Sequence, residues 1–159
     1  MTTEREIRES HFVEEVGLLA DEMGETRMIG RVIGHLLICD PPHQTAQQIA
    51  EQLDASRGAV SSAIRQLLRA GILDKHAVPN SRATYVRIQD HPWPDMLRRW
   101  LAFLRIFVGV ADQGLELLAS DDPERRRRLE RLREFFVYLE HEFPPVIDRY
   151  SESTDKEAE

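Results

Sequence analysis

The stretch "LDASRGAVSSAIRQLLRAGIL", residues 53–73, carries signals that start, build and end an amphipathic helix. Ser56 stands where a helix N-cap is expected, and Gly71 where a left-handed C-terminal cap is expected. Between them an apolar stripe recurs at helical spacing, formed by Val60, Ile64, Leu67 and Leu68. The opposite face holds Gly, Ser and Arg, although the whole chain of 159 residues has a net charge of −7. This acid-free face is the first candidate for a functional surface.

The neighbours of this helix predict a winged helix-turn-helix. Thr45 and Gln48 form a capping-box pair that opens a short helix ending near Leu53, so only residues 54–56 separate the two helices. Two short helices joined so tightly are typical of a helix-turn-helix. After Gly71, residues 72–76 and 83–88 alternate as short strands around the turn formers Pro79, Asn80 and Ser81. They predict a β-hairpin wing.

Charge is distributed unevenly along the chain. Residues 1–54 have a net charge of −7, and residues 89–159 have −5. Residues 55–88 hold six basic residues and one acid, a net charge of +5. A compact basic window is the electrostatic footprint of a protein that binds a phosphate backbone. The sequence therefore favours DNA as a partner despite the acidic total.

The predicted interface combines this helix with the wing. Small side chains allow close approach of the backbone to DNA, and Arg pairs with guanine in the major groove. We expect Arg57, Lys75 and Arg82 on phosphates, and Ser61, Ser62 and Arg65 nearest the bases. The predicted DNA-binding residues are Ser56, Arg57, Gly58, Ser61, Ser62, Arg65, Lys75, Asn80, Ser81 and Arg82.

The flanking segments are predicted to be helical. Residues 4–23 and about 26–39 precede the basic window, with Gly30 and Gly34 spaced for close helix packing. A helix over about 94–119 is apolar nearly all round, which predicts burial on several sides. Another, over 123–142, has a coiled-coil-like seam. Its basic run 125–133 is interpreted as a solvated face paired with nearby Glu residues.

The predicted fold class is mainly α with a small β-hairpin wing. The expected organisation is an N-terminal dimerisation helix over 1–24, a DNA-binding domain over 25–90, C-terminal dimerisation helices over 91–150 and a disordered tail over 151–159. Aromatic residues at helical spacing are usually core, but they also suggest an effector pocket. Its candidate residues are Trp93, Trp100, Phe103 and Phe107.

Two features of residues 30–88 are distinctive: the Ser-Arg-Gly-x-x-Ser start of the central helix, and the hairpin that carries Arg82 and Tyr85. With these features the segment resembles the MarR-type winged-helix regulators, most of all the GbsR-like group. The resemblance implies that residues 56–70 lie in the major groove and residues 75–85 form the wing. It further implies a two-fold dimer of the terminal helices. Such regulators usually repress, and they release DNA when a small molecule or stress signal arrives.

Several classes of function find no support. No nucleophile elbow, phosphate loop or zinc signature is present, so we expect neither an enzyme nor a cofactor. Three histidine clusters lack the spacing of metal ligands, so no metal site is predicted. They are His11 with Glu14 and Glu15, Asp40 with His43, and Glu140 with His141. Single Cys39 suits a buried thiol in a reducing compartment. The chain has no apolar run long enough to span a membrane and no signal segment, which predicts a cytoplasmic protein.

The sequence thus predicts a homodimeric transcription regulator that acts as a repressor. Its expected site is a palindromic operator with half-sites about 10 bp apart or a multiple of that. Two alternatives stay open. A winged helix also serves as a protein-interaction module, and acidic arms suit a basic partner. A metal-responsive sensor is the other alternative.

Overall fold

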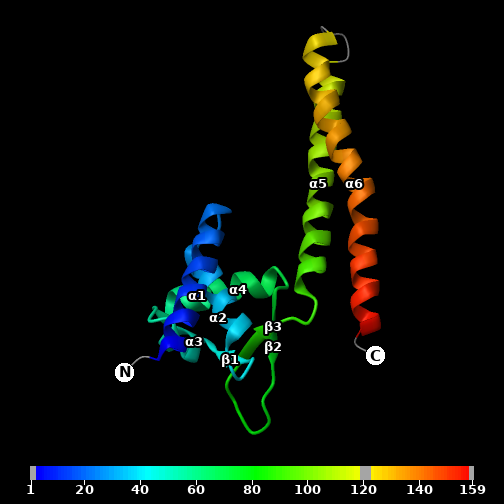
Figure 1. Cartoon of the computed structure of the whole chain (residues 1–159). Helices are drawn as coiled ribbons and strands as arrows, with labels where there is room; N and C mark the ends of the chain where they lie inside the picture. Colours follow the sequence, from blue (N-terminus) through cyan, green and yellow to red (C-terminus); the bar gives the residue numbers. More distant parts are fainter. Residues whose placement is uncertain (1–2, 119–122, 158–159) are drawn as a thin grey trace. The chain divides into compact units, whose positions relative to one another are not determined.

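The computed structural model describes residues 3–118 and 123–157, with side chains as far as residue 153. Its elements are α1 (Glu4–Glu22), α2 (Arg27–Ile38), β1 (Gln44–Thr45), α3 (Ala46–Gln52), α4 (Arg57–Arg69), β2 (Leu73–His76), β3 (Tyr85–Ile88), α5 (Pro92–Leu117) and α6 (Pro123–Glu157). They form two compact units, Met1–Pro92 and Trp93–Glu159 (Figure 1). The predicted fold class, mainly helical with a small β-hairpin wing, is confirmed.

The helix ends are set by the capping residues that the sequence indicates. Thr45 caps α3 and forms a full capping box with Gln48, and the Ser56 side chain accepts a hydrogen bond from the Ala59 amide at the start of α4. Gly24 and Gly71, which follow α1 and α4, have φ angles of +84° and +65°. Glycine adopts this left-handed conformation without the steric penalty of a side chain.

The first unit contains a three-stranded antiparallel sheet in the order β1-β3-β2. β2 and β3 form the predicted hairpin, paired from Leu73 with Ile88 to His76 with Tyr85. β1 adds two further pairs on the other side of β3, Gln44 with Val86 and Thr45 with Tyr85. The sequence did not predict β1, because two residues are too few to show alternation.

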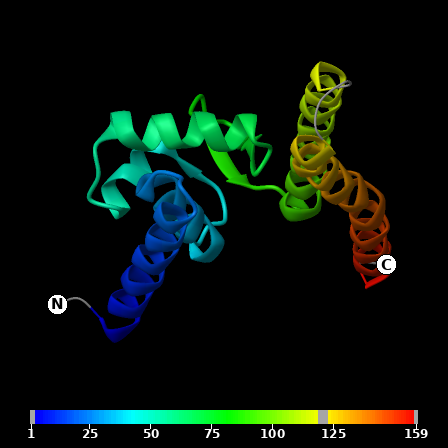
Figure 2. The same cartoon turned by 90° about the horizontal axis from the view of Figure 1, so that it is seen from above.

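A single hydrophobic core holds the first unit together. α2, α3, α4 and the sheet each contribute a buried face to it, and Val32, Ile49 and Val60 have no exposed surface. The acid-free face of α4 is opposite its buried residues Val60, Ala63, Ile64 and Leu67. Figure 2 shows α4 lying across this unit.

Close packing of α1 against α2 places the N-terminal helix in the first unit, together with the helix-turn-helix that the sequence assigned to a separate segment. Gly30 and Gly34 permit this approach, as predicted: a Cβ at Gly30 would lie 2.7 Å from the Ala20 Cβ, and one at Gly34 would lie 3.1 Å from the Val16 Cβ. Real Cβ atoms do not approach as closely as the first distance.

α5 and α6 form a helical hairpin, in which Figures 1 and 2 both show the two helices side by side. Leu101 and Leu104 of α5 pack with Ile147 of α6. The chain itself leaves much of α5 uncovered: Trp100, Phe103 and Val110 are each at least half exposed. The predicted burial of α5 on several sides is therefore not provided by its packing against α6.

The sequence predicts a disordered tail from residue 151, whereas α6 continues as helix to Glu157, through Pro144 and Pro145. Residues 158 and 159 of the predicted tail lie outside the described residues. The helix continues past residue 151 for a physical reason. Packing of Ile147 and a hydrogen bond from the Arg98 guanidinium to Ser151 Oγ, 3.2 Å long, hold the helix beyond the prolines, whose missing N–H donors favour a break. Tertiary contacts override the local signal.

Gly30→Ala is expected to lower the free energy of unfolding by about 1–3 kcal/mol, because the added methyl forces α1 away from α2. Thermal and urea denaturation measure this loss. Gly58→Ala is the matched control, since a Cβ there would meet nothing within 4 Å. Equal stability of the two variants would show that the helix approach does not depend on Gly30.

Candidate nucleic-acid interface

α4 divides into a buried and an exposed face. Arg57, Gly58 and Arg65 are exposed, and Ser61 and Ser62 are partly buried beside the core-facing stripe. The Ser56 hydroxyl accepts the Ala59 N–H at 3.2 Å, so this predicted contact residue first serves as the helix cap. A cap oxygen still has a further acceptor lone pair and a donor hydrogen available. The predicted α4 residues thus lie on or beside one solvent-facing surface.

The start of α4 allows close approach of a partner. A Cβ at Gly58 would meet no atom within 4 Å, so packing inside the protein does not require glycine there. Gly58 lies in the first turn of α4, where backbone N–H groups have no partner within the helix and favour phosphate. The open space over Gly58 is therefore suited to a ligand backbone.

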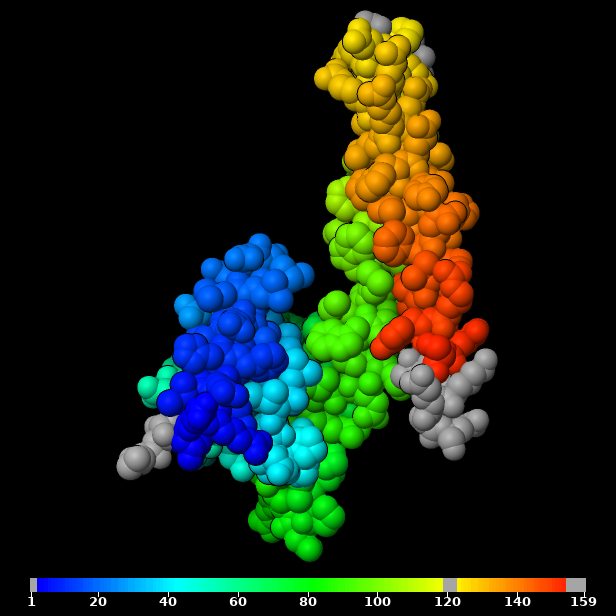
Figure 3. Space-filling view, viewed as in Figure 1, coloured from blue at the N-terminus to red at the C-terminus, as the bar shows by residue number. Residues whose placement is uncertain are grey.

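The wing places the remaining predicted residues outside the core. Lys75 is exposed on β2, and Asn80, Ser81 and Arg82 are exposed in the connecting loop. Asn80 has a φ angle of +63°, and the amide of Ser81 donates to the Val78 carbonyl over 3.2 Å. Asn80 and Ser81 thus shape the turn that carries Arg82. Figure 3 shows this loop, in green, projecting from the body of the first unit.

Ion pairing sorts the basic window into two groups. Arg87 is neutralised by Asp74 on the neighbouring strand, at 3.0 and 3.3 Å, and this hydrogen-bonded pair raises the pKa of Arg87. Among the side chains of residues 3–118 and 123–153, the other five cations of the window have no carboxylate partner. They are Arg57, Arg65, Arg69, Lys75 and Arg82. Most arginines outside the window are instead paired with carboxylates of their own unit, so positive charge is left available here.

Sequence reasoning missed two features of this interface. Arg69 is exposed and forms no ion pair in the described part of the chain, and its helical spacing from Ser62 and Arg65 places it on the same face of α4. At the base of the wing, the His43 ring lies 4.5 Å from that of His76 and 5.5 Å from that of Tyr85. These three rings come from separate segments, so no sequence spacing indicated the cluster.

The four candidate effector-pocket aromatics lie in the second unit, on α5. Each is between 39% and 54% exposed, and Phe107 stacks on Phe136 of α6 with ring centroids 4.7 Å apart. Phe103 meets Phe107 edge-on at 5.9 Å. Phe103 and Phe107 of α5 thus form a row of ring contacts with Phe136 of α6. Their role in effector binding stays a prediction.

In two of the candidate metal clusters, one glutamate has a cationic partner. Glu14 pairs with Arg27 and Arg31, and Glu140 with Arg105. Across the described residues, no three His, Cys, Asp or Glu side chains are grouped to hold a metal ion. The Cys39 thiol is partly buried, and burial raises its pKa. None of these groups forms a visible reactive centre.

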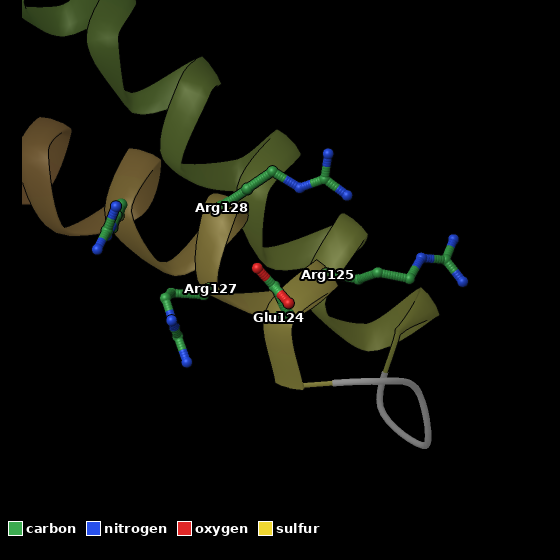
Figure 4. A pocket seen from close by; sticks show the side chains of 5 residues that line it. Glu124, Arg125, Arg127 and Arg128 are labelled. Carbon is green, nitrogen blue, oxygen red and sulfur yellow. The ribbon is translucent and has the colours of Figure 1, made fainter.

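The basic run of α6 lines a shallow depression with Glu124, Arg125, Arg127, Arg128 and Arg131. Arg126 is anchored instead, donating to the carbonyls of Leu115 and Leu118 and pairing with Glu130 at 3.6 Å. In Figure 4 the Arg125 and Arg128 side chains extend in much the same direction, and the Arg127 side chain extends in another. The arrangement is a charged helix surface without convergent ligands.

Comparison with known proteins identifies the chain. It is 33% identical to the HTH-type transcriptional regulator MmpR5 of Mycobacterium tuberculosis (strain ATCC 25618 / H37Rv), over 92% of this chain and 88% of that protein. The chain belongs to the MmpR5-like MarR family of transcriptional regulators. The family pattern itself matches residues 91–153. A MarR-type regulator is thus confirmed, whereas the GbsR-like group is not.

A solved structure supports the same assignment. The crystal structure of a transcriptional regulator matches with a TM-score of 0.80 and 32% identity, covering 91% of this chain and 99% of that one. The protein is accordingly a DNA-binding transcriptional regulator with a winged-helix fold, and it is no enzyme. Among its described residues, no helix is long and apolar enough to cross a membrane.

Gly58→Ala separates stability from DNA binding. Replacing an exposed helical glycine raises the free energy of unfolding by up to about 1 kcal/mol, whereas the methyl group occupies the space a DNA backbone needs. We expect a higher melting temperature and weaker DNA binding, measured by thermal denaturation and fluorescence anisotropy. Gly109→Ala on α5, also without neighbours within 4 Å, should leave affinity unchanged. Unchanged affinity in Gly58→Ala would show that DNA does not approach this turn.

Proposed function

We propose that the protein is a homodimeric repressor that binds a palindromic operator through α4 and the wing. The observation that carries this proposal is the set of five unpaired cations on α4, β2 and the wing loop, in a chain whose net charge is −7. Unpaired Lys and Arg side chains can replace the counterions of a phosphate backbone without first breaking a bond inside the protein. DNA binding by this surface is therefore energetically accessible.

Roles follow from position. Arg57 at the start of α4, with Lys75 and Arg82 on the wing, contacts phosphates and fixes the register of the protein on the duplex. Ser61, Ser62 and Arg65, one or two turns further along α4, face the base edges. Gly58 and the cap residue Ser56 bring the helix start close to the backbone, and Asn80 and Ser81 hold Arg82 in the wing turn.

Dimerisation is supported by apolar surface on the second unit. Phe103, Ile106 and Val110 of α5 and Phe135 and Tyr138 of α6 are all more than half exposed. Exposed apolar side chains that recur at helical spacing on both helices of a hairpin support an interface there. A second copy would cover it and supply the missing burial of α5, and two-fold symmetry would then match a palindromic DNA site.

Regulation would act through the same helices. An apolar effector that binds beside Trp93, Trp100, Phe103 and Phe107 would alter the contacts between protomers, and thereby the spacing of the two α4 helices. The protein would then leave its operator. A cytoplasmic location suits this role and the single, partly buried Cys39.

Arg65→Ala tests the function directly. We expect a loss of about 1–3 kcal/mol of binding free energy on operator DNA and a relaxed sequence preference, because a base contact is removed. Affinities would be measured on DNA from upstream of the protein's own gene and on a shuffled duplex, each at two salt concentrations. Glu51→Ala, outside α4, is the control variant.

Equal losses on both duplexes would assign Arg65 to phosphate instead. Weak binding of the wild-type protein to every duplex, without salt dependence, would overturn the operator proposal and favour a protein-interaction module.

Phe103→Glu tests the dimer. Phe103 is 54% exposed in the single chain, so the substitution should leave the fold intact, but it places a charge in the proposed interface. Sedimentation equilibrium should show a dimer for the wild type and a monomer for the variant. Glu116→Lys, a charge change at an exposed position of the same helix outside the Phe103–Ile106–Val110 stripe, should stay dimeric. A dimer that persists in Phe103→Glu would place the interface elsewhere.

A further inference from the structure

Arg31 on α2 contacts two other helices at once. Its Nη2 atom donates a hydrogen bond of 2.7 Å to the carbonyl of Leu53, the residue that ends α3. Its Nε atom lies 2.8 Å from Glu14 Oε1 on α1, close enough for an ion pair although poorly aligned for a directed hydrogen bond. One side chain thus links the N-terminal helix to the first helix of the helix-turn-helix.

The Leu53 carbonyl stands at the start of the turn that leads to α4. Asp54 follows with a φ angle of +45°, and the amide of Ala55 donates back to the Ala50 carbonyl over 2.9 Å. Ser56 then caps α4. A carbonyl at a helix C-terminus has no partner within its helix, and a cation there is favoured by the helix dipole. Arg31 therefore fixes the end of α3 from which the path to α4 begins.

The structure makes room for this arrangement on α1. A Cβ at Gly17, one turn after Glu14, would lie 2.8 Å from Arg31 Cγ and 3.1 Å from Arg27 Cγ. Glycine at this position lets the Arg31 stem cross α1 while its guanidinium reaches both partners. The Arg31 side chain is only 20% exposed. Helix packing and the guanidinium contacts thus point independently to a fixed position for Arg31.

Glu14 is held ionised at this junction. Desolvation, the largest single influence, acts to raise its pKa, but the hydrogen bond from Arg27 and the charges of Arg31 and Arg27 outweigh it and leave the pKa below its ordinary value. The carboxylate therefore stays available as the anchor on α1 across neutral pH.

We propose that Arg31 is a positioning residue of the DNA-binding site: it holds the helix-turn-helix turn against α1, so that the N-terminal helix sets the orientation of the recognition helix. The proposal rests on the proposed function of α4. Arg31 lies on α2 and acts without touching DNA. A movement of α1 is thereby passed to α4 through two polar contacts as well as through the core.

Arg27 provides a matched control. It also binds Glu14, with Nη2 2.6 Å from Oε2, but its side chain is 53% exposed and makes no contact with the turn. Arg27→Met and Arg31→Met remove the same charge from the same helix and each leave Glu14 with one arginine. Any general electrostatic effect on DNA binding is therefore equal in the two variants.

The experiment compares operator affinity, its salt dependence and amide hydrogen exchange in the two variants of the full chain. We expect Arg31→Met to bind about fivefold more weakly than Arg27→Met, with an unchanged salt slope because no phosphate contact is lost. Exchange at Asp54 and Ala55 should accelerate only in Arg31→Met. Arg31→Lys, which can reach one partner but not both, should be intermediate.

Equal affinity and equal exchange in the two methionine variants would overturn the proposal, as would a reduced salt slope, which would make Arg31 a phosphate contact. If Arg31→Met does not fold, the Gly17→Ala variant provides the test, because its added methyl group displaces the aliphatic part of the Arg31 side chain while alanine itself favours the helix. We expect faster amide exchange at Ala55 in this variant. Unchanged exchange would overturn the proposal. If wild-type protein binds no DNA, the proposed function fails, and the exchange comparison alone decides whether Arg31 positions the turn.

Discussion

Burial of one stripe of α4 is the constraint on which the rest of the structure depends. Val60 and Leu67 sit in a core built by α2, α3 and the sheet, so α4 cannot rotate about its axis without exposing them. The face opposite this stripe is consequently fixed toward solvent. The core does not require particular side chains on this face, so their chemistry can suit a binding partner. Core and interface are thus two consequences of one helical periodicity.

Ion pairing also differs between the basic window, residues 55–88, and the rest of the chain. Arginines outside the basic window mostly bind carboxylates of their own unit, as Arg98 binds Asp148 and Arg133 binds Asp112. Exposed pairs of this kind contribute little to stability, but each one neutralises an arginine that could otherwise bind an anionic partner. Inside the window, Arg87 is the only cation that pairs with a carboxylate among the described residues, and its closest partner is Asp74. Selective pairing thus leaves positive charge available on α4 and the wing of an acidic chain.

Local sequence signals predicted much of the fold and of the candidate DNA interface. Caps at Thr45 and Ser56, the left-handed glycine at position 71 and the alternation after it are properties of short stretches, so the helix-turn-helix and hairpin could be located from sequence. Contacts between distant residues could not be. β1 is too short to leave a pattern, the bond from Arg31 to the Leu53 carbonyl joins segments 22 residues apart, and α6 passes its prolines through packing against α5.

Thr45 belongs to two structures at the same time. It pairs with Tyr85 in the sheet, and its hydroxyl accepts the Gln48 amide that begins α3. A one-residue slip of β1 along β3 would turn its side chains to the other face of the sheet and uncap α3 together. Insertions and deletions in homologues should therefore concentrate in residues 77–84, beyond the last strand pair, where chain length can vary without disturbing either element. The length of the wing loop can therefore change while the paired strands at its base stay in register.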